Sequence, residues 1–345
     1  MKTFVLTGIR AMEMREVPTP TIQKDTDVLL RLKAVGVCGS DVHYYKTGRI
    51  GSQVVQYPFA VGHECAAVVE AVGAGVTRVR PGDRVAIEPA ISCGACDQCV
   101  AGRPHTCRKL LFLGCPGQIP GCLSEFMVMP QACCFPIPAA LTLERAVLTE
   151  PLSIGVYAVK LSGLTGGARI GILGLGPIGL SVLLPAKAHG VAAIYATDKL
   201  DYRLEAARKA GATWAVNPDR EDAVKAIADR EPLLLDFVFE CCGEQAALDQ
   251  AVDLLKPGGK LMLIGIPTVD RLAFTIDQAR RKELCIQNVR RQNHCVQPAL
   301  DLLTSGRIGA DFMITHRFPF DRTQEAFDLV ERYGDGVIKA LIEMG

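Results

Sequence analysis

The middle of the chain alternates short apolar runs with longer helical patterns, and this alternation restricts the possible folds more than any other feature. Apolar runs that predict strands lie at residues 169–173, 193–197, 213–216, 233–239 and 260–264. Helical patterns lie between them, first up to residue 189 and then at 202–209, 220–229 and 245–255. Strands that alternate with helices form right-handed crossovers, so the pattern predicts an α/β domain with a doubly wound parallel sheet. Pro185 predicts a kink in the first of these helices.

The segments on either side differ from the middle in composition and hydrophobic pattern, and they predict a second, mostly β domain. They are rich in Gly and Pro and contain strand patterns at residues 27–34, 66–72 and 84–87. A chain of 345 residues is long enough for two domains. We expect the β domain at 1–150 with a lobe at 90–110, the parallel-sheet domain at 151–288, and a return to the first domain at 289–345.

A glycine-rich turn after the first of the alternating strands predicts a dinucleotide site. Gly174, Gly176 and Gly179 match a fingerprint in which the turn lets a pyrophosphate approach a helix N-terminus. Asp198 follows the next strand, at the place of the carboxylate that binds the ribose hydroxyls. A carboxylate there repels a 2′-phosphate, so NAD is expected in preference to NADP. The simpler alternatives are an ordinary glycine turn and a helix-capping role for Asp198.

Cysteine spacing predicts a structural metal site. The chain has 14 cysteines, and four of them, Cys93, Cys96, Cys99 and Cys107, lie in one short segment. Four thiolates close a tetrahedral zinc site and leave no open position. An iron–sulfur cluster and unpaired core thiols are the alternatives. Because this is a long chain without an evident export signal, we interpret the thiols as reduced and the protein as cytoplasmic.

A second set of possible ligands is dispersed along the β domain. Cys38, His63, Glu64 and Glu150 are of the residue types that build an open, catalytic zinc site. Taken singly, each has a simpler explanation, such as a core histidine or a carboxylate in an ion pair.

Overall charge and hydropathy exclude several classes of partner. Lys and Arg total 38 and Asp and Glu total 37, a balance that favours neither nucleic acid nor an anionic membrane surface. No apolar run approaches the length of a membrane span, and the apolar stretch near the N-terminus is too short for a signal peptide.

Several motifs carry a resemblance that runs essentially the whole length of the chain. VCGSDVHYYKTGRIG, YPFAVGHE, LTEPLSIGVYAV, GLGPIGL and ITHRFPF are similar to segments of the zinc-dependent medium-chain alcohol dehydrogenases, most closely the sorbitol (L-iditol 2-) and polyol dehydrogenase branch. The resemblance implies a Rossmann domain for NAD and a GroES-like catalytic domain. It also implies a homodimer or homotetramer.

The same resemblance assigns metal and proton-transfer roles to particular residues. Cys38, His63 and Glu64 match zinc ligands, and Glu150 matches a carboxylate at or beside the metal that holds its water. The four-cysteine segment matches a structural zinc lobe. Ser40 matches the first relay for the alcohol proton and His43 its terminus near solvent, with Glu150 on a parallel route.

Substrate and cofactor positions follow from the resemblance as well. The substrate positions are Tyr44, Glu150, Arg291 and Gln292, where the branch has an Arg-Tyr pair in place of Arg291-Gln292. The further cofactor positions are Ile178, Arg203, Ile264, Gly265, Ile266, Val289, Arg290 and Arg291. Gln292 in place of Tyr is predicted to change the preference among stereoisomers.

The predicted function is the oxidation of a secondary hydroxyl of a polyol to a ketose, with hydride transfer to NAD. The alternatives are a dehydrogenase of another hydroxyl substrate on the same scaffold, such as a sugar acid, a polyol phosphate, a threonine-like or a simple alcohol. A non-catalytic zinc scaffold is the alternative from a different class, and the complete set of candidate ligands speaks against it.

Overall fold

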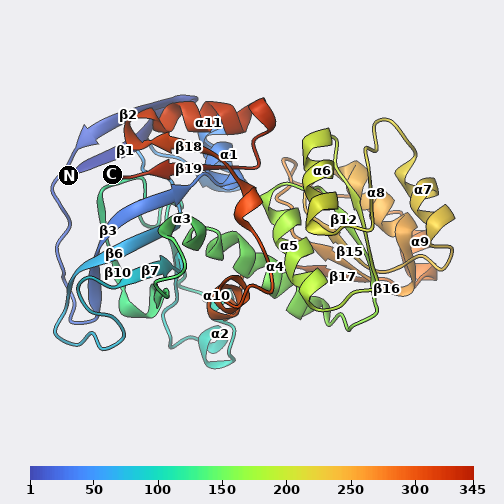
Figure 1. Ribbon diagram of the computed structural model, residues 1–345, viewed down its shortest axis with the longest axis horizontal. Coiled ribbons are helices and arrows are strands. Elements are labelled where there is room, and N and C mark those ends of the chain that lie inside the picture. Colours follow the sequence, from blue (N-terminus) through green and yellow to red (C-terminus); the bar gives the residue numbers. More distant parts are fainter. The chain divides into compact units, whose positions relative to one another are not determined.

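The computed structural model describes residues 1–345, and the chain divides into two compact units. The first unit consists of Met1–Glu150 and Met313–Gly345, and the second consists of Pro151–Phe312. Both termini lie in the first unit (Figure 1).

The first unit is built on a seven-stranded sheet. Its strands run in the order β11 (Cys134–Pro136), β7 (Arg84–Ile87), β6 (Glu64–Val72), β3 (Asp27–Gly36), β19 (Lys339–Glu343) and β18 (Ile314–Pro319), and β10 (Phe126–Pro130) also pairs with β3. Smaller two-stranded sheets are formed by β1 (Lys2–Gly8) with β2 (Ala11–Glu16), β4 (Arg49–Ile50) with β5 (Gln53–Val54), and β8 (Ala90–Ile91) with β9 (Leu111–Phe112). The expected strands at 27–34, 66–72 and 84–87 correspond to β3, β6 and β7.

Few helices accompany this sheet. They are α1 (Gly39–Thr47), α2 (Asp97–Val100), α3 (Leu143–Ala146), the start of α4 (Thr149–Ser162) and α11 (Thr323–Glu331). The hydroxyl of Tyr45 on α1 donates a hydrogen bond of 2.6 Å to Asp328 on α11. The rings of Tyr45 and of Phe327 on α11 pack edge to face, so α11 holds α1, the helix that follows β3, in place.

The second unit has a six-stranded parallel sheet, as the alternating pattern predicted. Its strands run in the order β14 (Trp214–Val216), β13 (Ala193–Thr197), β12 (Arg169–Leu173), β15 (Leu235–Glu240), β16 (Leu255–Leu263) and β17 (Cys285–Asn288). Its helices are α5 (Pro177–Ala188), α6 (Asp201–Ala210), α7 (Ala223–Arg230), α8 (Gln245–Leu254), α9 (Ile276–Arg281) and α10 (Val296–Thr304), with the remainder of α4 (Figure 1).

The direction of winding reverses between β12 and β15. From β12 the chain proceeds outwards to β13 and β14, and then it returns to β15 and proceeds the other way. Right-handed crossovers on the two sides of such a reversal place helices on opposite faces of the sheet. The loops at the carboxyl ends of β12 and β15 therefore diverge, which is where open α/β sheets bind ligands.

The chain returns to the first unit later than residue 289. The intervening α10 packs within the second unit, where it lines a shared cavity with α4 and α5. Arg307, just after α10, donates a hydrogen bond of 3.0 Å to the carbonyl of Ala188 at the end of α5. The apolar face of α10 is covered there, so the boundary expected at 288 was placed too early.

The helix α5 contains Pro185 and extends to Ala188, and the kink expected at this proline stays a prediction. One local expectation differs from the structure. The strand expected at 260–264 begins already at Leu255, as β16, and the Pro-Gly-Gly segment lies inside it. The pairing of β16 with β15 shifts register beside this segment, so the glycines are accommodated by an irregularity in the strand.

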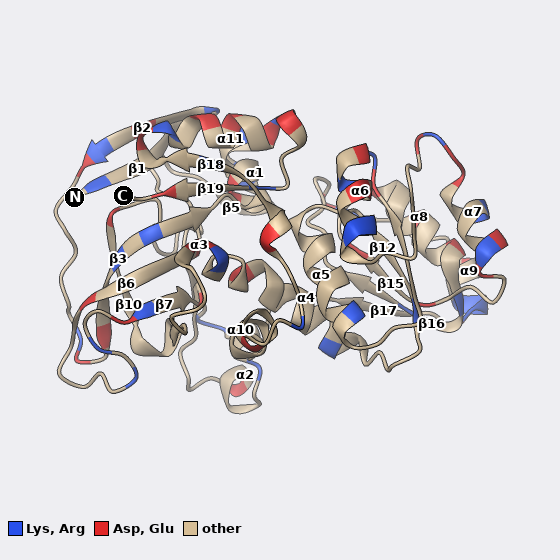
Figure 2. Cartoon of the chain, in the orientation of Figure 1, with Lys and Arg blue, Asp and Glu red and all other residues tan.

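None of the helices is both long and apolar enough to cross a membrane. Acidic and basic residues are interspersed along the elements of both units, as Figure 2 shows, in keeping with a net charge of +1.

Candidate functional site

Strand pairing in the first unit brings three candidate metal ligands together. Cys38 is the N-cap of α1, just beyond the end of β3. Glu64 is the first residue of β6 and pairs with Gly36 of β3, and His63 immediately precedes it. The ligand atoms of Cys38, His63 and Glu64 all lie within 4.8 Å of one another.

Asp41 orients the imidazole of His63. One carboxylate oxygen of Asp41 lies 3.2 Å from Nδ1 of His63 and accepts a 3.1 Å hydrogen bond from the amide of Gly62. Burial alone would lower the pKa of His63, but Asp41 and Cys38 raise it well above its usual value. With Nδ1 directed at Asp41, the other ring nitrogen, Nε2, remains for a metal.

A lysine and a second carboxylate complete the buried group. Lys339 of β19 and Glu64 are both 1% exposed, and they form an ion pair of 2.6 Å. Burial by itself lowers the pKa of Lys339, but Glu64 and Cys38 outweigh that effect and hold it above its usual value. Glu150 lies outside the three-ligand group, yet it is buried and interacts electrostatically with His63 and Glu64.

Burial raises the pKa of Glu150 to about 8, and Glu64 and Glu88 contribute in the same direction. The charges of His63 and Lys339 oppose this shift. A divalent cation placed among these groups acts in the same sense as His63 and favours the ionised carboxylate.

The donor atoms of the first group fit zinc. A Cys sulfur, a His nitrogen and a carboxylate oxygen are ligands that zinc takes in catalytic sites, where a fourth position stays open. A histidine whose second nitrogen contacts a buried carboxylate is typical of such sites. Sequence reasoning missed Asp41 and Lys339, although Asp41 lies within the Cys-Gly-Ser-Asp motif and was detectable as an acid close to a ligand.

The helix α1 places the expected proton-transfer residues on one side. Ser40 and His43 are three residues apart, so they share a helix face. The hydroxyl of Ser40 donates a 3.3 Å hydrogen bond to the sulfur of Cys38. Burial, and then the charge of Lys46, lowers the pKa of His43, which favours the neutral imidazole.

Tyr44, an expected substrate contact, belongs to a small polar network in the same unit. Its hydroxyl donates a 3.0 Å hydrogen bond to the side-chain oxygen of Gln53. The side-chain nitrogen of Gln53 lies 2.8 Å from the sulfur of the buried Cys115.

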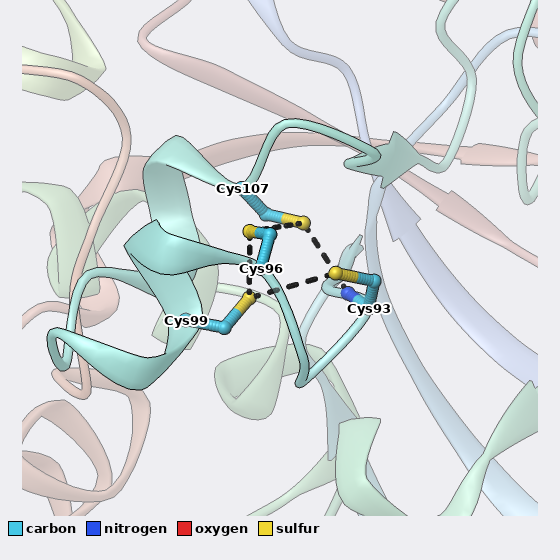
Figure 3. A group of neighbouring side chains, drawn as sticks. All are labelled: Cys93, Cys96, Cys99 and Cys107. Carbon is cyan, nitrogen blue, oxygen red and sulfur yellow. Dashed lines mark hydrogen bonds between the residues drawn. The ribbon is translucent and has the colours of Figure 1, made fainter.

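The four closely spaced cysteines converge on one point. Figure 3 shows the sulfur atoms of Cys93, Cys96, Cys99 and Cys107 facing a common centre beside α2. The sulfurs of Cys96 and Cys99 are 3.6 Å apart, those of Cys96 and Cys107 3.8 Å, and those of Cys93 and Cys99 4.0 Å. Four sulfurs bound tetrahedrally at about 2.3 Å from zinc lie about 3.8 Å apart, so the group fits zinc.

Backbone amides and one ion pair support this lobe. The amides of Cys93 and Lys109 each donate a 3.3 Å hydrogen bond to the sulfur of Cys107. Backbone N–H groups of Arg108 and Cys99 lower the pKa of Cys96 to about 6. Negative charge on the sulfur of Cys96 is thereby stabilised, as metal binding by a thiolate requires. Burial, followed by the neighbouring thiols, instead raises the pKa of Cys99 to about 11.

In the second unit, the glycine-rich turn has the shape that a dinucleotide needs. Gly174 has φ of +91°, and a Cβ atom on Gly179 would lie 1.9 Å from the carbonyl oxygen of Gly174. Gly176 is the N-cap of α5, and Ile178 lies in its first turn. The turn therefore brings unobstructed backbone to a helix N-terminus, which is an anion-binding arrangement.

Asp198 stands directly beside this turn. One carboxylate oxygen accepts a 2.7 Å hydrogen bond from the amide of Leu175, and the other accepts one of 2.9 Å from Leu200. Arg203 approaches the carboxylate to 3.6 Å. Each carboxylate oxygen has a second lone pair, so Asp198 can still accept hydrogen bonds from ribose hydroxyls.

A buried glutamate organises the loops that follow β15 and β16, across the sheet reversal from Asp198. Sequence reasoning missed this residue. Glu240 ends β15, and its carboxylate accepts hydrogen bonds of 2.7 Å and 2.6 Å from the amides of Cys242 and Gly243. Its carbonyl accepts hydrogen bonds from Ile264 and Gly265, which were expected to line the cofactor. The acid at the end of an apolar strand was the available signal.

The remaining expected residues lie on two segments of the second unit. Ile266 follows β16, while Val289, Arg290, Arg291 and Gln292 follow β17. Arg291 has φ of +52°, and the side-chain oxygen of Gln292 accepts a 2.7 Å hydrogen bond from the amide of Cys295 at the start of α10. The roles of these residues toward substrate and cofactor remain predictions.

Family models match most of the chain. A model described as "Alcohol dehydrogenase GroES-like domain" matches residues 24–139, and one described as "Zinc-binding dehydrogenase" matches residues 177–305. The first segment lies within the first unit and contains β3, β6, β7, β10 and β11, and the second lies within the second unit and contains β13 to β17.

Full-length relatives agree with the models. A sorbitol dehydrogenase of Bacillus subtilis is 36% identical over 346 residues, 99% of this chain and 97% of that protein. A sorbitol dehydrogenase of Gallus gallus is 37% identical over 333 residues, 96% of this chain and 92% of that protein. An Escherichia coli oxidoreductase of unknown specificity superposes with a TM-score of 0.94 at 31% identity, over 100% of this chain and 99% of that one. The chain thus belongs to the zinc-binding dehydrogenases, in the polyol dehydrogenase branch of the medium-chain alcohol dehydrogenase family.

Proposed function

We propose that the protein oxidises a secondary hydroxyl of a polyol to a ketose, with NAD as the hydride acceptor. The observation that carries the proposal is the group formed by Cys38, His63 and Glu64, whose ligand atoms lie within 4.8 Å of one another. The same chain also contains a dinucleotide-type turn. A zinc-dependent oxidoreductase that uses NAD requires both features. The sorbitol dehydrogenase relatives support a polyol as the substrate class.

The chain's own residues would hold two zinc ions in different ways. Cys38, His63 and Glu64 form the open site, with Glu150 beside them, and the four lobe cysteines form the closed site. When bound, zinc in the open site supplies Lewis acidity to an alcohol oxygen, and NAD accepts a hydride.

We assign removal of the substrate's hydroxyl proton to the two residues that share a face of α1, Ser40 and His43. Ser40 is placed by its hydrogen bond to Cys38 to receive the hydroxyl proton of the substrate. Burial and the charge of Lys46 lower the pKa of His43 and favour its neutral form, which can accept the proton and pass it to solvent. Glu150 offers the parallel route.

Recognition of the substrate rests on polar side chains. Tyr44, Glu150, Arg291 and Gln292 would meet the hydroxyls next to the reacting carbon. Tyr44 is held by Gln53, so its hydroxyl is already oriented. A site with several buried polar groups rejects a substrate that leaves them unpaired.

Assembly and location remain proposals too. We infer a homodimer or homotetramer, because β17 is an edge strand of the parallel sheet and its Ile286 is 38% exposed. Pairing of β17 with the same strand of a second copy would satisfy both edges. Cytoplasmic location is proposed because the lobe needs reduced thiols.

Metal analysis tests the two zinc sites. We expect two zinc ions per chain, one for each group of ligands. Cys38→Ser is expected to lose one of them, the one that a chelator removes faster, because the open site exchanges with solvent and the closed site does not. Cys285→Ser, which changes an exposed cysteine outside both groups, is the matched control and should keep both ions. At most one zinc in the undamaged wild-type protein contradicts this assignment.

Cofactor preference tests Asp198. Asp198→Asn removes the charge that repels a 2′-phosphate and weakens a charge-assisted hydrogen bond to the ribose. The ratio of kcat/KM with NADP to kcat/KM with NAD should therefore rise by roughly tenfold or more. Asp201→Asn, an exposed carboxylate on α6, should leave the ratio unchanged. Equal efficiency of the wild type with both cofactors would remove Asp198 from this role.

A substrate panel tests the polar site. Polyols of four to six carbons are compared with 2-propanol, 2-butanol and threonine by kcat/KM. We expect the best polyol to exceed the monohydroxy alcohols by roughly 100-fold, because each unpaired polar group costs about 1–3 kcal/mol. Arg291→Ala should lower polyol oxidation, while Arg280→Ala on the exposed side of α9 should not. A monohydroxy alcohol that equals the best polyol would refute the polyol assignment.

The pH dependence of oxidation tests His43. Burial, and then the charge of Lys46, lowers the pKa of His43, so kcat should fall only as the pH drops through that lowered value and the imidazole becomes protonated. His43→Gln should slow oxidation at neutral pH by roughly 100-fold, and imidazole buffer should restore part of the rate. His189→Gln, which changes an exposed histidine of the second unit, is the control. An unchanged rate and pH profile in His43→Gln would exclude the residue from proton transfer.

A further inference from the structure

Lys339 is a fully buried cation to which the sequence-based predictions assign no role. Its side chain is 1% exposed, and it is one of the largest side chains so deeply buried in the protein. The ammonium donates to both carboxylate oxygens of Glu64, at 2.7 Å and 2.6 Å, and to the carbonyl of Val37 at 3.1 Å. Its three N–H groups are thus all used, and two of them are directed at a candidate zinc ligand.

The position of Lys339 is fixed by the backbone. In the pairing of β19 with β3, Leu341 lies opposite Gly36. The amide of Val37 donates a 3.0 Å hydrogen bond to the carbonyl of Ala340, the residue next to Lys339. Lys339 therefore lies next to the point where β3 leads into Cys38, and only 1% of it is exposed to solvent.

Glu64 is confined from a second side. A Cβ atom on Gly36 would lie 2.4 Å from Oε2 of Glu64, so the carboxylate packs directly against the backbone there. With Lys339 bound to both oxygens and Gly36 at its flank, Glu64 has little freedom to turn. A metal held by Cys38 and His63 must share the carboxylate with the ammonium.

Sharing has a predictable electrostatic consequence. The lysine competes for the lone pairs that a metal needs, and its positive charge repels a divalent cation at short range in a buried site. Both effects weaken the bond between Glu64 and the metal. Neither would be present if a neutral side chain occupied position 339.

We propose that Lys339 is a positioning residue that keeps Glu64 a weakly held, exchangeable zinc ligand beside the open position that takes the substrate hydroxyl. The proposal rests on the zinc chemistry proposed above. It adds that Lys339 determines how firmly Glu64, the third ligand, holds the metal. It assigns the buried ion pair a role in metal exchange, where a purely structural counterion would only stabilise the fold.

The experiment measures zinc release to a chromogenic chelator. Lys339→Met removes the charge at nearly the same side-chain length, and we expect the catalytic zinc to leave roughly tenfold more slowly, the order expected for one charge-assisted hydrogen bond. The phase of release that belongs to this zinc is the one missing in Cys38→Ala. kcat for polyol oxidation should fall together with the release rate.

Further variants separate the proposal from a structural role. Lys339→Gln keeps N–H donors without charge and should also slow release. In a Glu64→Gln background, Lys339→Met should no longer change the rate, because the shared carboxylate is gone. Lys282→Met removes a lysine of the second unit that donates to three backbone carbonyls, so it should alter thermal stability but not zinc release.

Each outcome decides a different statement. If folded, zinc-loaded Lys339→Met and Lys339→Gln release zinc as fast as the wild type or faster, Lys339 is only a counterion and the proposal fails while the zinc function stands. If the wild-type protein holds no zinc at Cys38, the proposed function fails and the role of Lys339 with it. The Co²⁺-substituted protein gives an independent readout, because its visible spectrum should change between wild type and Lys339→Met only if the ligand geometry changes.

Discussion

The antiparallel pairing of β3 with both β6 and β19 is the constraint on which the candidate zinc site depends. Gly36, the last residue of β3, lies opposite Glu64 of β6 on one side and Leu341 of β19 on the other. Cys38 follows two residues later, next to His63 and Lys339. A slip of one residue in either register would turn alternate side chains to the other face and disperse the group.

The buried charges around the candidate zinc site are arranged in pairs of opposite sign. Asp41 faces His63, and Lys339 faces Glu64, so each buried charge has an opposite neighbour. Removing one partner would leave the other unpaired in a region of low dielectric, which is costly. In the proposed metal site, Asp41 would support the histidine ligand and Lys339 would draw on the carboxylate ligand.

In the second unit, two buried carboxylates have comparable tasks on the two sides of the reversal between β12 and β15. Asp198 accepts hydrogen bonds from the amides of Leu175 and Leu200, and Glu240 accepts them from the loop that follows β15. Loops at the carboxyl ends of parallel strands carry few backbone hydrogen bonds of their own. These side chains supply the missing acceptors and fix the backbone of the loops.

The sequence by itself determined what depends on neighbouring residues: the parallel sheet, the glycine-rich turn and the four-cysteine lobe, whose ligands are close together in the chain. It did not determine where the second unit ends. The helix α10 belongs to that unit because its apolar face is buried against it, and the sequence does not show against which unit a helix packs. Nor did it show that Glu64 joins Cys38 and His63 while Glu150 stays outside, or that Lys339 is buried among them. Only the tertiary structure decided these points, because they follow from the register between strands that are far apart in the chain.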